Sequence, residues 1–290
     1  MGGSDPVPLK FRIDVWLETV PALLRALDVQ HVSLMSHSAG TMYAFNTLYQ
    51  MRDILDPQRP YVAMVAPWVH NEHSHQLLWN LASKIPSGLF SSWNGIVRLI
   101  NTRVAPSVGW SSGTFSSAVN IFRAEGGVGD ANKLTPGETY GVSEEVGECI
   151  ENLQWKWFLA ESTTAGNDEA LLCLKKNTES GTEPGSGAHW GVCENYEEYV
   201  RQLTRQEQEW RSTHEGTAKL RIDSFFAESD VMIGKEGQQY FEQCWEQDGV
   251  ADAISFSSTV LPKTDHDSAT ADLKKGSLKL IFEHVAGHNQ

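Results

Sequence analysis

The sequence predicts an α/β protein in which a parallel sheet is interrupted by a large helical insertion. Apolar, strand-like segments alternate with amphipathic helical segments at both ends of the 290-residue chain, as is typical of parallel sheets, whose strands are joined by helical crossovers. Between Val69 and Leu220 the alternation stops and helical patterns prevail. We therefore expect a core in two parts, residues 1–70 and 218–290, and a cap-like insertion at residues 71–217.

The first core part reads as helix, strand, helix and strand. Apolar residues recur at helical spacing from Ile13 to Leu27, and the later segment YVAMVAPWV is apolar throughout, as in a strand buried on both faces. Pro57 and Pro60 separate this strand from the helix before it. The expected elements are a helix at Phe11–Leu27, a strand at Val32–Met35, a helix at Thr41–Leu55 and a strand at Tyr61–Val69.

The second core part repeats the pattern. The segments LRIDSFFA and ISFSSTVL are rich in apolar and β-branched residues, and each is followed by a helical pattern. The expected elements are a strand at Leu220–Ala227, a helix at Gly237–Trp245, a strand at Ile254–Leu261 and a closing amphipathic helix at Leu273–Val285. The sheet would therefore have about four strands.

The insertion is rich in helical patterns and tryptophan. In its acidic segment Glu194–Glu209, apolar side chains at helical spacing should turn inward, while the charged face meets solvent. The Gly/Ser/Thr/Glu-rich stretch Asn177–Gly187 predicts a flexible loop. The expected helices are Gln76–Ile85, Trp93–Val104, Ser143–Ser162 and Tyr196–Trp210, with Tyr196, Tyr199, Val200 and Leu203 as the inward residues of the last.

Composition excludes several classes of function. A formal net charge of -14 and a pI near 5.1 argue against nucleic acid as a partner, because phosphate neutralisation needs clustered Lys and Arg. No apolar run is long enough for a membrane span, and the N-terminal residues lack a signal-peptide core, so we expect a cytoplasmic protein. The cysteines are scattered without CxxC pairing, which predicts reduced thiols: Cys149, Cys173, Cys193 and Cys244.

The residues Ser36–Gly40, SHSAG, lie between a predicted strand and a predicted helix. This is the setting of a nucleophile elbow, a sharp turn that lifts one serine hydroxyl above the sheet at a helix N-terminus. The serine would be Ser38. Small residues are needed two positions before and after it, and here they are Ser36 and Gly40.

A serine hydroxyl is a poor nucleophile until a histidine can accept its proton, and a carboxylate usually orients that histidine. Asp230 follows the predicted strand Leu220–Ala227, and His266 follows the strand Ile254–Leu261. Both therefore lie at carboxyl ends of parallel strands, where sites in such sheets form. We expect Ser38, Asp230 and His266 to converge. The rival groups that the sequence offers are Asp223, Asp265, Asp267, His284 and His288.

Two other groups of residues allow a functional and a structural interpretation. The cluster His70, Glu72, His73 and His75 has metal-ligand side chains, but its spacing fits no compact motif, so we expect polar residues at the start of the insertion and neither a metal nor an organic cofactor. Four tryptophans could line an apolar pocket or serve as ordinary packing: Trp68, Trp79, Trp93 and Trp110.

Five segments resemble the α/β-hydrolase superfamily, and most of all its fungal members with a SHSAG elbow: GGSDPV, SHSAGTMYAFNTL, YVAMVAPWV, ESDVMIG and TDHDS. The resemblance implies hydrolysis of an ester, thioester or related acyl bond through an acyl-enzyme, with Ser38, Asp230 and His266 as the catalytic residues. It also implies that the backbone N–H of Ala39 stabilises the oxyanion. The expected substrate contacts are His37, Trp68 and Trp93.

In the family, a motif like Gly2-Gly3-Ser4-Asp5 follows the fourth strand, so the resemblance implies that earlier strands, and a second oxyanion donor, are missing. The strand Val32–Met35 would then be an exposed edge through which the chain could self-associate. Two alternatives to the hydrolase therefore stay open. One is a non-catalytic protein that binds a ligand or partner, and the other is an acyl transferase or a product-releasing enzyme of natural-product biosynthesis.

Overall fold

The computed structural model describes residues 5, 7–76, 79–80, 83–84, 135–160, 164–176 and 188–287. Several predictions of the sequence lie outside these residues: the helix Trp93–Val104, much of the helix Gln76–Ile85, the loop Asn177–Gly187, and the individual residues Gly2, Gly3, Ser4, Trp93, Trp110 and His288.

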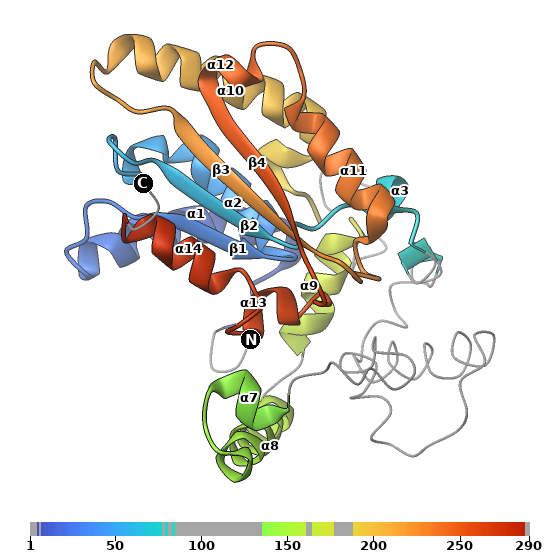
Figure 1. Ribbon diagram of the computed structural model, residues 1–290. Coiled ribbons are helices and arrows are strands. Elements are labelled where there is room, and N and C mark those ends of the chain that lie inside the picture. Colours follow the sequence, from blue (N-terminus) through green and yellow to red (C-terminus); the bar gives the residue numbers. More distant parts are fainter. Residues whose placement is uncertain are drawn as a thin grey trace.

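A parallel sheet of four strands forms the centre of the molecule, in the order β1-β2-β3-β4 (Figure 1). The strands are β1 (Leu34–His37), β2 (Tyr61–Val65), β3 (Leu220–Ala227) and β4 (Ile254–Leu261). This confirms the predicted α/β class. Strand β1 is an edge, because within the described residues its only hydrogen-bonded neighbour in the sheet is β2.

Two predicted strands of the first core part have different bounds in the structure. Strand β1 begins two residues later than expected, and Val32 forms only an isolated bridge to Leu55. Strand β2 ends at Val65 rather than Val69, because the positive φ of 42° at Ala66 turns the chain out of the sheet. The last residues of β1 and β2, His37 and Val65, are therefore paired, and Ser38 follows directly at this end of the sheet.

The helices around the sheet also depart from the prediction in places. Instead of one helix at Thr41–Leu55, the chain forms α2 (Gly40–Gln50) and a 3-10 turn, η2 (Arg52–Ile54), because Met51 leaves helical geometry with φ -136°. The closing helix α14 (Leu278–Val285) begins later than expected, because the Asp272 carboxylate accepts hydrogen bonds from Lys274 and Lys275 and forms a turn there. The remaining core helices are η1 (Leu9–Phe11), α1 (Arg12–Ala26), α11 (Gly234–Trp245), α12 (Val250–Ala253) and α13 (Ser268–Ala271).

The two central strands, β2 and β3, are buried on both faces, whereas much of β4 is exposed. Side chains of α1, α2 and α11 pack in the larger hydrophobic cluster on one face. Ala269 of α13 and Ile281 of α14 pack on the other face, against Tyr61, Ala63 and Val65 of β2.

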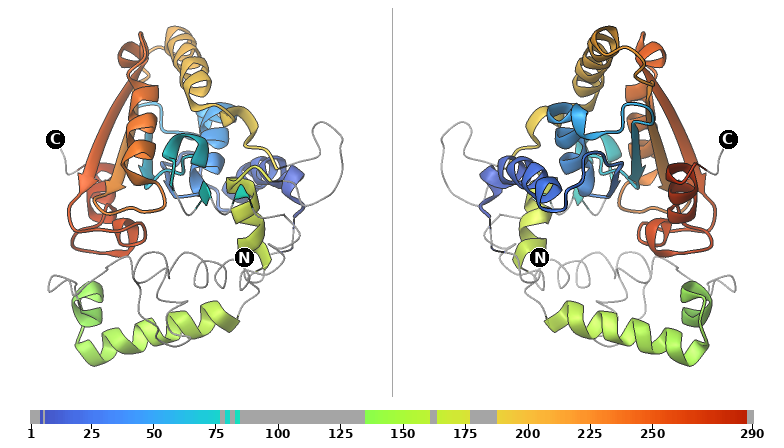
Figure 2. Two further views of the ribbon diagram at one scale, coloured as in Figure 1. Left: turned by 90° about the vertical axis from the view of Figure 1, so that its right-hand side faces the viewer. Right: turned by 90° about the vertical axis from the view of Figure 1, so that its left-hand side faces the viewer.

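The segment 71–217 contains α3 (Asn71–Ser74), α7 (Pro136–Tyr140), α8 (Glu144–Ala160), α9 (Thr164–Cys173), η6 (Gly191–Cys193) and α10 (Tyr196–Thr213). Helices α7 and α8 lie apart from the body that holds the sheet (Figure 2). Helix α10, in contrast, packs against the body that holds the sheet. Tyr199 stacks on Phe45 of α2 with ring centroids 4.4 Å apart and donates its hydroxyl to the Phe45 carbonyl. The four predicted inward residues of α10 are buried, so this helix packs as part of the core layer. In the described part of the chain, no helix is both long and apolar enough to cross a membrane.

Candidate active site

The turn between β1 and α2 holds Ser38 in a left-handed conformation, with φ 53°. A non-glycine residue adopts this conformation at an energetic cost, and it persists only where neighbouring contacts fix it. Here the Ser38 N–H donates to the Val65 carbonyl at 3.0 Å, and the Ser38 carbonyl accepts from the backbone N–H and the hydroxyl of Thr41. The turn is therefore fastened to both β2 and α2.

Close contact explains the small residues of SHSAG. A Cβ atom added to Gly40 would lie 3.3 Å from the Ser36 Cβ, closer than most such contacts in proteins. Two larger side chains at these positions would push β1 away from the first turn of α2. The predicted need for small residues thus has a direct steric cause.

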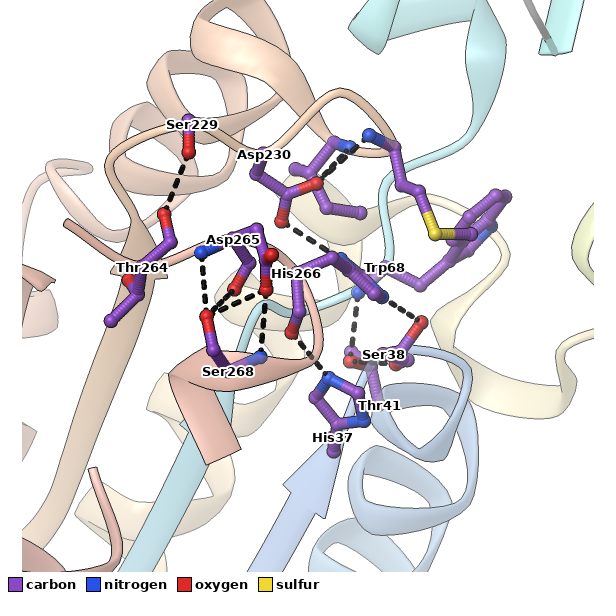
Figure 3. Close-up of polar contacts among 12 residues, drawn as sticks. His37, Ser38, Thr41, Trp68, Ser229, Asp230, Thr264, Asp265, His266 and Ser268 are labelled. Carbon is purple, nitrogen blue, oxygen red and sulfur yellow. Dashed lines mark hydrogen bonds and ion pairs between the residues drawn. The ribbon is translucent and has the colours of Figure 1, made fainter. Parts of the chain in front are cut away.

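Three side chains from three loops meet above this turn (Figure 3). His266 Nε2 lies 2.8 Å from Ser38 Oγ, and His266 Nδ1 lies 2.8 Å from Asp230 Oδ2. The side chains of His266 and Asp230 are 6% and 4% exposed, whereas Ser38 is half-buried. The structure therefore brings together the three residues that the sequence placed at strand ends, and Ser38 is the most accessible residue of the three.

The carboxylate of Asp230 is oriented by backbone groups. Its Oδ1 accepts hydrogen bonds from the N–H groups of Met232 and Ile233, both at 2.9 Å, which directs Oδ2 toward the histidine. An ionised carboxylate can only accept, so Nδ1 of neutral His266 carries the proton. Nε2 is then the acceptor for the Ser38 hydroxyl. The sequence also allows Asp230 to be a helix N-cap or a loop residue, and in the structure the carboxylate accepts from these two amides while it faces His266.

His266 has to reach across the sheet. It follows β4, the strand farthest from β1, and three steps between neighbouring strands amount to about 14 Å. The loops after β3 and β4 are joined on the way, because both the N–H and the hydroxyl of Ser229 donate to the Thr264 carbonyl. The pair of loops thus positions Asp230 and His266 together.

His37 contacts the histidine loop. Its Nε2 lies 2.9 Å from the His266 carbonyl oxygen, and the two rings are 4.9 Å apart. Burial lowers the pKa of His37, and the nearby charge of His266 lowers it further. The sequence predicted His37 as a substrate contact, but the contact that the structure describes is with His266.

Trp68 lies behind the elbow. Its backbone N–H donates to Thr41 Oγ1 at 3.0 Å and to the Ser38 carbonyl at 3.3 Å. Its side chain is 1% exposed, packs edge-on against Trp79 and donates to the Cys173 carbonyl. Of the two interpretations that the sequence left open, this burial favours ordinary packing for Trp68. Ala39, the expected oxyanion donor, is the N-cap of α2 directly after Ser38.

The described rival groups have other partners. Asp223 pairs with Arg221 and accepts from Ser257, Asp265 accepts from Ser268, and the His284 ring lies against Tyr61. Asp267 is the N-cap residue of α13 beside the site, and burial raises its pKa.

The cluster at the start of the insertion does not form a metal site in the described residues. His73 stacks on Tyr240 with ring centroids 3.7 Å apart, and His70 lies against Trp190. Across the described ranges, no group of three or more His, Cys, Asp or Glu side chains is arranged to hold a metal ion.

The sheet order and the strand-end site can be compared with solved structures. The haloalkane dehalogenase DatA from Agrobacterium tumefaciens matches with a TM-score of 0.50 and 11% identity, over 99% of this chain and 77% of that chain. The fold is that of an α/β-hydrolase. Epoxide hydrolase I from potato (Solanum tuberosum) matches with a TM-score of 0.49 and 14% identity, over 99% of this chain and 80% of that chain.

At these identities the likeness concerns the α/β-hydrolase fold alone. No family model matches the chain, and no curated protein matches it. Function must therefore be argued from the site itself.

Proposed function

We propose that the protein is a serine hydrolase that cleaves an ester, a thioester or a similar acyl bond of a small apolar substrate. The observation that carries the proposal is the continuous hydrogen-bonded path from Ser38 Oγ through His266 to Asp230, with both distances at 2.8 Å. A serine hydroxyl becomes a useful nucleophile only when such a base is in reach.

The proposed reaction has two halves. Ser38 Oγ attacks the carbonyl carbon as its proton passes to His266 Nε2, and Asp230 stabilises the imidazolium through Nδ1. The negative oxygen of the tetrahedral intermediate is stabilised by the Ala39 N–H at the start of α2, where the helix dipole is positive. His266 then protonates the leaving alcohol or thiol, which leaves an acyl ester on Ser38. A water molecule, deprotonated by His266, releases the acid by the same steps in reverse order.

Covalent labelling with a fluorophosphonate tests the proposal, because this probe reacts with an activated serine. We expect the wild type to label and Ser38→Ala to remain unlabelled, with the modified peptide containing Ser38. His266→Ala should slow labelling by about a thousandfold or more, because the hydroxyl then has no base. Ser212→Ala, at an exposed serine of α10, is the matched control and should label like the wild type.

Three results would count against the proposed hydrolase. Labelling that persists in Ser38→Ala would place the reactive group elsewhere. A folded wild type that does not label would favour the non-catalytic binding protein, whereas rapid acyl-enzyme formation without hydrolysis would favour acyl transfer to another acceptor.

A further inference from the structure

His37 is the last residue of β1 and directly precedes Ser38, yet its side chain contacts the opposite side of the site. Its Nε2 lies 2.9 Å from the carbonyl oxygen of His266, which is 229 positions away in the chain. A carbonyl oxygen can only accept, so Nε2 carries the proton. The contact therefore links β1, the strand that ends directly before Ser38, to the backbone of His266.

This contact holds the His266 loop from the side of β1, whereas the other hydrogen bonds hold the loop from the side of β3. The hydrogen bonds of Ser229 and Asp230 attach the histidine loop to the loop after β3, two strands away from β1. His37 attaches the same loop to β1 itself. Since His266 is held on both sides, its ring has little freedom to move away from the Ser38 hydroxyl (Figure 3).

We propose that His37 is a positioning residue that holds the backbone of His266 and so sets the separation of His266 Nε2 from Ser38 Oγ. This inference rests on the proposed function, because it gives His37 a role in that reaction.

The electrostatics of the site suit this role. The ionisable groups near the His37 ring are His266, Asp267 and Asp230. Burial lowers the pKa of His37, which keeps the ring neutral at neutral pH. A neutral ring 4.9 Å from His266 donates its hydrogen bond without repelling the imidazolium that forms during the reaction.

Two substitutions separate the hydrogen bond from the packing of the ring. His37→Leu fills much of the same space but has no donor, while His37→Gln can present an amide N–H near the position of Nε2. We expect His37→Leu to lower the maximal rate of fluorophosphonate labelling, kinact, by about ten- to a hundredfold with little change in KI, since misplacement by about 1 Å can cost that much. His37→Gln should recover most of that loss.

Labelling of the wild type tests the hydrolase proposal, and the rates of the two variants relative to the wild type test the positioning proposal. If the wild type labels and His37→Leu labels equally fast, the positioning proposal is overturned while the hydrolase proposal stands. If His37→Gln is as slow as His37→Leu, the donor is not what matters, and the positioning proposal is again overturned. A wild type that does not label overturns both.

The tautomer of His37 provides a second test, which is read from the wild-type protein and not from a rate. In the 15N NMR spectrum of the histidine-labelled wild type at neutral pH, we expect His37 with its proton on Nε2 and His266 with its proton on Nδ1. The missing signal of His37→Gln assigns the resonance. A proton on Nδ1 of His37 would contradict the proposal, because Nε2 could then not donate to the carbonyl.

Discussion

Asp230 has a separate partner for each of its two carboxylate oxygens. Oδ1 accepts two backbone N–H groups and Oδ2 faces His266 Nδ1. Both oxygens of a carboxylate can only accept, so His266 Nδ1 has to donate to Oδ2. The residue therefore fixes the tautomer of His266 in addition to its orientation.

This arrangement predicts the effect of Asp230→Asn. If the Asn oxygen keeps the two backbone bonds, its NH₂ group faces His266 Nδ1 and favours the tautomer with the proton on Nε2, which cannot accept from Ser38. We expect labelling by a fluorophosphonate to fall by about 10³- to 10⁴-fold. Thermal unfolding of the variant serves as the control and should remain cooperative. A labelling rate close to that of the wild type would exclude the proposed role of Asp230.

At the scale of elements, the junction between β1 and α2 depends on the close approach of Gly40 to Ser36. Gly40→Val should lower the free energy of unfolding by about 1–3 kcal/mol, because its branched side chain forces these elements apart. Adding Ser36→Gly removes the opposing Cβ and should restore part of the loss. Urea unfolding of the two single variants and the double variant measures this coupling. Strictly additive effects would show that the contact is not what requires Gly40.

The strands differ in how well the sequence predicts them. The bounds of β3 and β4 agree with the prediction, because each segment is rich in apolar and β-branched residues. The bounds of β1 are set instead by where β2 lies beside it, and no local pattern reveals that. Similarly, the loops of Asp230 and His266 could be placed from chain order, whereas the contact of His37 with a distant carbonyl leaves no signal in the sequence around it.

At the scale of the whole molecule, partly buried histidines link stability to pH. Burial lowers the pKa of four histidines below the ordinary value of 6.5: His37, His70, His73 and His284. As the pH falls through 6.5, the unfolded chain therefore binds protons that the folded chain does not. The stability contribution of these groups is complete above that pH and is lost as the pH falls.

We therefore expect the free energy of unfolding to decrease between about pH 7.5 and about pH 6. Urea denaturation followed by tryptophan fluorescence measures it at each pH. His37→Gln should show a shallower decrease, since one of the contributing groups is absent. If the free energy of unfolding stays constant or increases as the pH is lowered over this range, these histidines are not protected from protonation in the folded state.

The strand order also has a consequence for how the protein is made. Along the chain, β1 comes first and β4 last, and His266 lies 228 residues after Ser38. During synthesis the serine therefore leaves the ribosome well before the histidine that activates it. The two side chains can meet only after the loop that follows β4 has been made. A nascent chain that has reached only β3 carries the serine without its base.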